Sequence, residues 1–149
     1  MDFQFLFVNF QGRIGRTVFR IGAVVLLAMF LGISFLIVIQ TRGFELGRGF
    51  ALAMVQLLFL HPACALMAKR LHDRGYSAYP LVVVAAPIVV ERYRYLRNLF
   101  AGEPGPETLD YFLWGIALAA AVWLLIELGF LPGTAGPNRY GPNPFGDSR

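Results

Sequence analysis

Long apolar runs separated by short polar segments dominate the pattern along the chain. Ile21–Ile39 contains 19 residues without a charge, and Gly49–Ala68 contains 20. Each run is long enough to cross about 30 Å of hydrocarbon as a helix, which rises about 1.5 Å per residue. Tyr111–Leu131 is a third apolar run, with a single charged residue, Glu127, near its end. Runs of this length and composition predict membrane-spanning helices.

A fourth apolar run, Tyr76–Val90, has only 15 residues and contains Pro80 and Pro87. At about 1.5 Å per residue it covers about 22 Å, which is less than the hydrocarbon thickness. Extension of the helix through residues 91–95 adds length, because arginine and tyrosine side chains near a helix end reach the interface. We therefore predict an all-α, polytopic membrane helix bundle with four spans, the third of them short and proline-containing. The alternative is three spans plus a re-entrant segment.

The whole chain, 1–149, is predicted to form a single integral membrane domain, with spans at about 17–40, 49–68, 76–95 and 110–131. Residues 1–16 are predicted to be an interfacial N-terminal segment, because Phe3, Phe7 and Phe10 would share one face of a helix. A frayed leader that packs under the bundle is an equal alternative. Residues 132–149 form a Gly/Pro-rich tail that cannot continue a helix, and we expect this tail to dock against basic motifs elsewhere in the chain.

Composition supports a membrane protein and excludes several other classes. The chain is 57% hydrophobic and 15% charged, against about 45–50% and about 25% for an ordinary soluble domain. With a mean hydropathy of +0.60, these figures exclude a disordered chain, a coiled coil and a basic nucleic-acid-binding domain. The single cysteine excludes a disulfide framework and the usual structural zinc sites. We therefore predict no nucleic-acid partner, no metal and no cofactor.

Charge is distributed unevenly between the two ends of the predicted bundle. With four spans, the end that holds both termini carries 8 Lys and Arg residues, and the opposite end carries 5. When the acidic residues are included, the net charges are +5 and 0, with Glu127 left inside a span. The positive-inside rule then predicts that both termini and the middle loop lie in the cytoplasm.

Three polar motifs fall at this predicted cytoplasmic end. They are Gly12-Arg13-Ile14-Gly15-Arg16, the segment Lys-Arg-Leu-His-Asp-Arg-Gly-Tyr-Ser at 69–77, and the Gly/Pro-rich segment at 133–144. Together, and in this order, they resemble the family called domain of unknown function 805, small bacterial inner-membrane proteins often described as YhaH-like. The resemblance covers nearly the whole chain, and it is carried most specifically by the tail and by the Leu-His-Asp sequence at 71–73.

This chain departs from the family pattern at four positions. Lys69 stands where the family has an arginine, Ala78 and Tyr79 replace a Gly-Trp pair, and Asn143 replaces a usual aspartate. Tyr79 is still an aromatic residue suited to the membrane interface. The resemblance implies a multi-pass location in the bacterial inner (plasma) membrane, and it implies no established reaction.

The candidate binding residues all come from these motifs. Arg13, Arg16 and Arg20 are spaced by three and four residues, so on a helix they would share one face. Such a row either fixes the topology or binds anionic headgroups. We assign ligand, lipid or partner binding to nine residues, namely Arg13, Arg16, Arg70, His72, Asp73, Arg74, Asn138, Arg139 and Tyr140.

Catalytic and metal chemistry have weaker support in the sequence. His72 is suited to a general base or a pH switch, but Asp73 is expected instead to pair with an arginine of the N-terminal motif or the tail. His61 and Cys64 would need two further ligands to hold a metal. Glu127 is expected to meet an arginine near the cytoplasmic interface. We therefore predict no catalytic residue and no metal site.

Three functions remain open at the sequence level. The first is a non-enzymatic membrane protein whose basic cytoplasmic face binds anionic lipid or an envelope protein partner. The second is an oligomeric small transporter or channel, and small residues on the last span would suit packing in a homo-oligomer. The third is a membrane enzyme acting on a lipid phosphate through His72 and Asp73. We rank them in that order.

Overall fold

The structure, a computed structural model, describes residues 2–102 and 106–144. These residues form five helices and no strand, apart from an isolated antiparallel bridge between Asn138 and Gly141. The helices are α1 (Phe3–Phe7), α2 (Arg16–Gln40), α3 (Glu45–Asp73), α4 (Pro80–Ala101) and α5 (Thr108–Gly129). The prediction of an all-α fold is confirmed.

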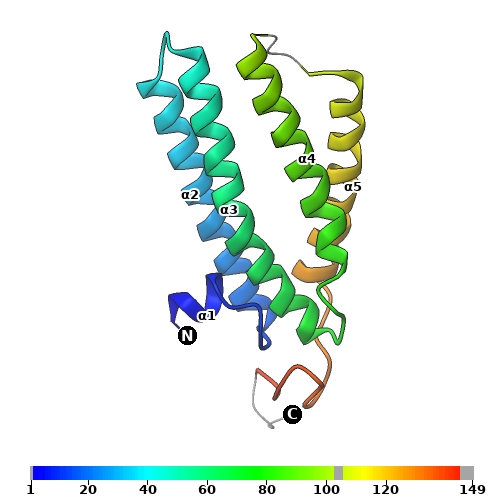
Figure 1. The fold of residues 1–149 in the computed structure, drawn as a ribbon. Helices are drawn as coiled ribbons and strands as arrows, with labels where there is room; N and C mark the ends of the chain where they lie inside the picture. Colours follow the sequence, from blue (N-terminus) through cyan, green and yellow to red (C-terminus); the bar gives the residue numbers. More distant parts are fainter. Residues whose placement is uncertain (1, 103–105, 145–149) are drawn as a thin grey trace.

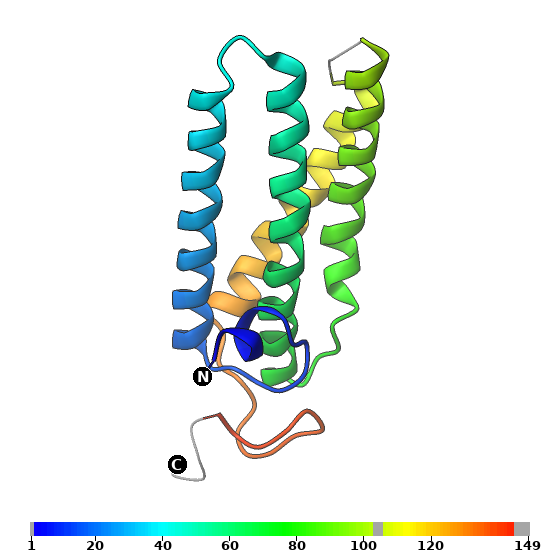
Figure 2. The same cartoon turned by 60° about the vertical axis from the view of Figure 1, so that its left-hand side comes forward.

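The four long helices form two hairpins that stand side by side (Figure 1). Helix α2 pairs with α3 and α4 pairs with α5, while α5 runs obliquely across the bundle so that its C-terminal end approaches α2 (Figure 2). Helix α1, the α3–α4 connection and residues 130–144 all lie at one end, which we call the tail end. The α2–α3 turn and the start of α5 lie at the opposite, far end.

Three of the helices, α2, α3 and α5, are long and apolar enough to cross a membrane. These helices expose large apolar side chains such as Leu27, Leu58 and Leu118, which suits hydrocarbon and not water. Helix α4 has the same 22-residue length as α5, but its second half carries several charged residues. The four-span arrangement requires α4 to cross the membrane as well, and this stays a prediction.

The helix ends differ from the predicted spans most clearly at α3 and α4. Helix α3 extends beyond 49–68 at both ends, and α4 begins at Pro80 and ends at Ala101 where 76–95 was expected. Proline is favoured at the first position of a helix, which accounts for the late start of α4.

Arg13 does not share a helical face with Arg16 and Arg20, so that expectation is wrong. Helix α2 begins only at Arg16, because Gly15, its N-cap, is extended.

The best-buried part of the molecule lies toward the tail end. Ile14, Leu71 and Leu128 are completely buried there, and they come from the segment before α2, from α3 and from α5. Helices α2 and α3 approach closely at Gly22, where an added Cβ would lie 2.9 Å from a methyl group of Leu66. The interior that joins the two hairpins therefore sits beside the polar motifs.

This close approach predicts that Gly22→Leu destabilises the protein. Overpacking of a tight contact costs about 1–3 kcal/mol, because Leu66 is itself only 2% exposed and has little room to move. The matched control is Gly32→Leu on the same helix, where an added Cβ meets no atom within 4 Å. Thermal unfolding in detergent should show a lower midpoint for Gly22→Leu alone, and equal midpoints for the two variants would contradict this packing.

Candidate functional site

A buried carboxylate at the end of α3 holds two arginines at the tail end. Asp73 is the last residue of α3, and one of its oxygens lies 3.1 Å from the guanidinium of Arg13, while the other pairs with Arg70. The side chains of all three residues are at most 1% exposed. Burial of charge is costly unless the charge is paired and hydrogen-bonded. We call Arg13, Arg70 and Asp73 the buried ion network.

The tail wraps around this buried ion network, as the sequence analysis expected. Arg13 donates hydrogen bonds to the carbonyls of Thr134 (3.0 Å), Gly136 (2.8 Å) and Gly141 (3.2 Å). The amide of Thr134 in turn donates to the carbonyl of Asp73 at 2.8 Å. A Cβ on Gly133 would overlap the Asp73 carboxylate, so glycine is required at that point of the tail.

His72 is also occupied by contacts within the chain. Its ring stacks on that of Tyr140, with centroids 3.9 Å apart and planes 7° apart, and Nδ1 lies 3.3 Å from the Gly12 carbonyl oxygen. Asn138 donates to the His72 carbonyl at 2.9 Å and accepts from the Tyr140 amide at 2.9 Å. Arg139, which is exposed, donates to the carbonyl of Gly75. His72 and Asp73 are therefore parts of a closed contact between α3 and the tail.

Four arginines donate hydrogen bonds to the C-terminal end of α5. The last carbonyls of a helix have no partner within the helix, and cations are favourable beside them. Here every carbonyl from 127 to 131 accepts from an arginine of α2 or of the segment at the end of α3. The pairs are Arg74 with Glu127 (3.0 Å), Arg70 with Leu128 (2.9 Å) and Leu131 (2.6 Å), Arg20 with Gly129 (3.1 Å), and Arg16 with Phe130 (3.4 Å).

The tail end carries an excess of positive charge. Its arginine cluster, as we call it, comprises Arg13, Arg16, Arg20, Arg70 and Arg74. In the part of the chain that the structure describes, the carboxylates that pair with the cluster are those of Asp73 and Glu127. The Arg74–Glu127 pair, at 3.0 Å, is the contact expected for Glu127. Arg16 is half-buried and Arg20 is exposed, so the excess charge reaches the surface through these two residues.

All nine residues assigned from sequence therefore lie together at the tail end. They differ in exposure: Arg13, Arg70, His72 and Asp73 are buried, Arg16, Arg74, Asn138 and Tyr140 are partly buried, and Arg139 is exposed. Three residues that make close contacts at the tail end were not among the nine predicted site residues: Arg20, Gly133 and Thr134. The sequence signal for Arg20 was its place in the basic row, and the signal for the other two was the Gly-Thr pair that opens the tail motif.

A second polar cluster, which was not predicted from the sequence, joins α4 to α5 near the far end. Arg94 donates to Asp110 at 2.9 Å and also pairs with Glu107. Asn98 donates to the Glu107 carboxylate at 3.0 Å, and this hydrogen bond, followed by that from Arg94, lowers the pKa of Glu107. Glu107 and Asp110 also form a capping box at the start of α5. The cluster therefore fixes the α4–α5 hairpin at the far end, where α4 ends and α5 begins.

Two titratable groups, His61 and Cys64, lie within the apolar part of α3. His61 is exposed on α3 and meets the edge of the Phe10 ring, with centroids 5.2 Å apart. Cys64 is a half-buried free thiol. Among residues 2–102 and 106–144, no group of three or more His, Cys, Asp and Glu side chains is placed to hold a metal ion.

The buried ion network predicts a large effect of Asp73→Asn. Removal of the charge leaves Arg13 and Arg70 buried without a counter-ion, which costs about 3–5 kcal/mol. The tail, which is held through Arg13, should also become accessible to protease. Asp2→Asn, at an exposed helix cap, is the control, because asparagine also caps a helix. An unfolding midpoint and a protease resistance equal to those of the control would overturn the assignment of Asp73.

Comparison with known proteins matches the sequence of this chain to one family. The family model described as "Protein of unknown function (DUF805)" matches residues 7–142. The chain is 34% identical over 146 residues to "Uncharacterized protein YiiR" of Escherichia coli K12, across 93% of this chain and 86% of that protein, and YiiR of E. coli O157:H7 gives the same figures. No solved structure matches. The chain belongs to the DUF805 family, whose function is unknown.

Proposed function

We propose that this is a non-enzymatic inner-membrane protein whose tail end faces the cytoplasm and binds anionic phospholipid. The observation that carries the proposal is the excess positive charge of the arginine cluster, which reaches the surface at Arg16 and Arg20. These residues lie in the first two turns of α2, directly before its apolar stretch. Clustered arginines at that boundary attract anionic headgroups by about 1 kcal/mol each.

The contacts of the polar motifs favour this function over the enzymatic alternative. A general base needs access to the proton that it removes, whereas His72 is 9% exposed and stacked on Tyr140. Asp73 is 1% exposed and paired with two arginines. These residues serve to hold the tail, and the exposed arginines serve to bind lipid. An envelope protein partner or a homo-oligomer is the competing outcome for the same basic surface.

The predicted orientation can be tested with topology reporters. Four spans place both termini on one side, and the charge bias makes that side cytoplasmic. A cytoplasm-active reporter fused after Arg149 should therefore be active, while one inserted at Gly43, in the α2–α3 turn, should be inactive. If the C-terminus lies outside the cytoplasm and the reporter at Gly43 is still inactive, α4 does not cross; if the C-terminus lies outside and the reporter at Gly43 is active, the predicted orientation is wrong.

Lipid binding can be tested by the phospholipids that remain with the purified protein. We expect enrichment of anionic over zwitterionic phospholipid relative to the membrane, and loss of this enrichment in a triple variant, Arg16→Gln, Arg20→Gln and Arg139→Gln. Glutamine still donates to carbonyls but removes the charge. Lysine at the same three positions should restore the enrichment. Mass spectrometry of the retained lipids provides the measurement.

The matched control neutralises two exposed arginines at the far end, Arg42→Gln and Arg97→Gln, and should leave the enrichment unchanged. A triple variant that folds normally, as judged by its unfolding midpoint, and still retains anionic lipid would contradict the proposal. Equal losses in the triple variant and the far-end control would contradict it as well, because the effect would then not be specific to the tail end.

A further inference from the structure

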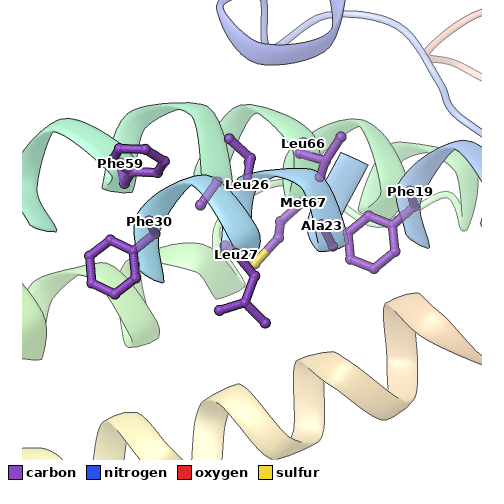
Figure 3. Close-up of a pocket in the computed structure, with 9 residues that line it drawn as sticks. Phe19, Ala23, Leu26, Leu27, Phe30, Phe59, Leu66 and Met67 are labelled. Carbon is purple, nitrogen blue, oxygen red and sulfur yellow. The ribbon is translucent and has the colours of Figure 1, made fainter. Parts of the chain in front are cut away.

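An apolar groove runs along α2 and α3 (Figure 3), and its first lining residue on α2, Phe19, directly precedes Arg20. It has a volume of about 260 Å³, and the walls expose almost entirely apolar atoms. Its lining includes Phe19, Ala23, Leu27 and Phe30 of α2 and Ala63 and Met67 of α3. Figure 3 shows α5 on the far side of its opening. The groove therefore lies between the two hairpins and is open at the molecular surface.

The groove and the two surface arginines lie on the same face of α2. Residues three, four and seven apart share a helix face, so the sequence from Arg16 and Arg20 through Ala23 to Phe30 forms one continuous stripe. Phe30 lies ten residues beyond Arg20, a rise of about 15 Å, which is half of the hydrocarbon core of about 30 Å. The groove therefore extends over about the depth of one leaflet, and Arg16 and Arg20 lie on the same stripe, toward the start of α2.

Arg16 and Arg20 use only part of their hydrogen-bonding capacity within the described chain. A guanidinium has five N–H donors, and among the described residues Arg16 and Arg20 each make one hydrogen bond to protein, both to carbonyls at the end of α5. The acids of the cluster, Asp73 and Glu127, are paired with Arg13, Arg70 and Arg74. An anion at this position would therefore meet two charged groups that no carboxylate of the described chain neutralises.

The two arginines and the apolar groove match the two parts of an anionic phospholipid, which are its charged headgroup and its acyl chains. We infer that the α2–α3 groove holds one acyl chain of an anionic phospholipid, whose phosphate is bound by Arg16 and Arg20. This inference rests on the proposed function and goes further, because it assigns one lipid a fixed position. A helix of about 10 Å diameter and about 15 Å length occupies about 1,200 Å³, so the groove suits a single hydrocarbon chain and not an inserted helix of a second copy.

The inference predicts selective photolabelling of the groove. The protein is reconstituted in phosphatidylcholine vesicles that contain a trace of a probe with a diazirine in the middle of one acyl chain. The probe is either phosphatidylglycerol, which is anionic, or phosphatidylcholine, which is zwitterionic. Labelling is mapped by peptide mass spectrometry at Met67 in the groove and at Leu118, which is 66% exposed on α5. We expect an excess of anionic over zwitterionic labelling at Met67 and none at Leu118.

Substitutions then separate the headgroup from the acyl chain. Arg16→Gln with Arg20→Gln should remove the anionic excess at Met67, and lysine at both positions should restore it. Ala63→Phe should remove the excess by filling the groove, and Ala23→Leu is the milder variant in case Ala63→Phe does not fold. Ala28→Phe, on the exposed opposite face of α2, is the matched control and should keep the excess.

The outcomes distinguish this inference from the proposed function. If wild-type protein retains anionic lipid on purification but Ala63→Phe and Ala23→Leu keep the labelling excess, the headgroup binds without a chain in the groove, and only the inference is wrong. If Met67 is labelled by neither probe while copies of the protein cross-link there, a second copy covers the groove, and the inference is again wrong. If purified wild-type protein shows no anionic enrichment, both are wrong.

Discussion

The buried positive charge at the tail end is the constraint on which the rest of the structure depends. Arg13 and Arg70 are almost completely inaccessible, and their charge is tolerated only because Asp73 and backbone carbonyls surround them. Each of these partners comes from a different part of the chain: the end of α3, the end of α5 and the tail. The ends of the two hairpins must therefore meet at one point, which explains why the best-packed interior lies beside the charges.

The same contacts solve a second problem, which is how α5 ends. A helix that ends near hydrocarbon cannot leave its last carbonyls without donors. The helix cannot continue beyond Gly129 to supply those donors, because Pro132 and Gly133 lie in the next turn. Arginines of α2 and α3 supply them, and this also draws the C-terminal end of α5 toward α2 across the bundle (Figure 2).

The sequence predicted the helical class, the apolar helices and the grouping of the three motifs, because hydrophobic run length and charge are local properties. It did not predict that Arg13 lies outside α2, or that Asp73 pairs with Arg13 and Arg70 at once, because these depend on how the turn at Gly15 and the tail fold over α3. The second polar cluster, around Arg94, was not predicted for a similar reason. Its partners Glu107 and Asp110 lie across a loop, and only the α4–α5 hairpin brings them together.

A structural role for the arginines does not by itself exclude a binding role, because the two make different demands on charge. A neutral donor such as glutamine could also donate hydrogen bonds to the helix-end and tail carbonyls, because its amide has two N–H donors. To neutralise Asp73 and Glu127, two positive charges would suffice, whereas the cluster has five. Unpaired charge at the edge of an apolar surface is unfavourable within the protein alone. The surplus at Arg16 and Arg20 is therefore available to a counter-ion from outside the chain, and under our proposal that counter-ion is the phosphate of a lipid at the membrane interface.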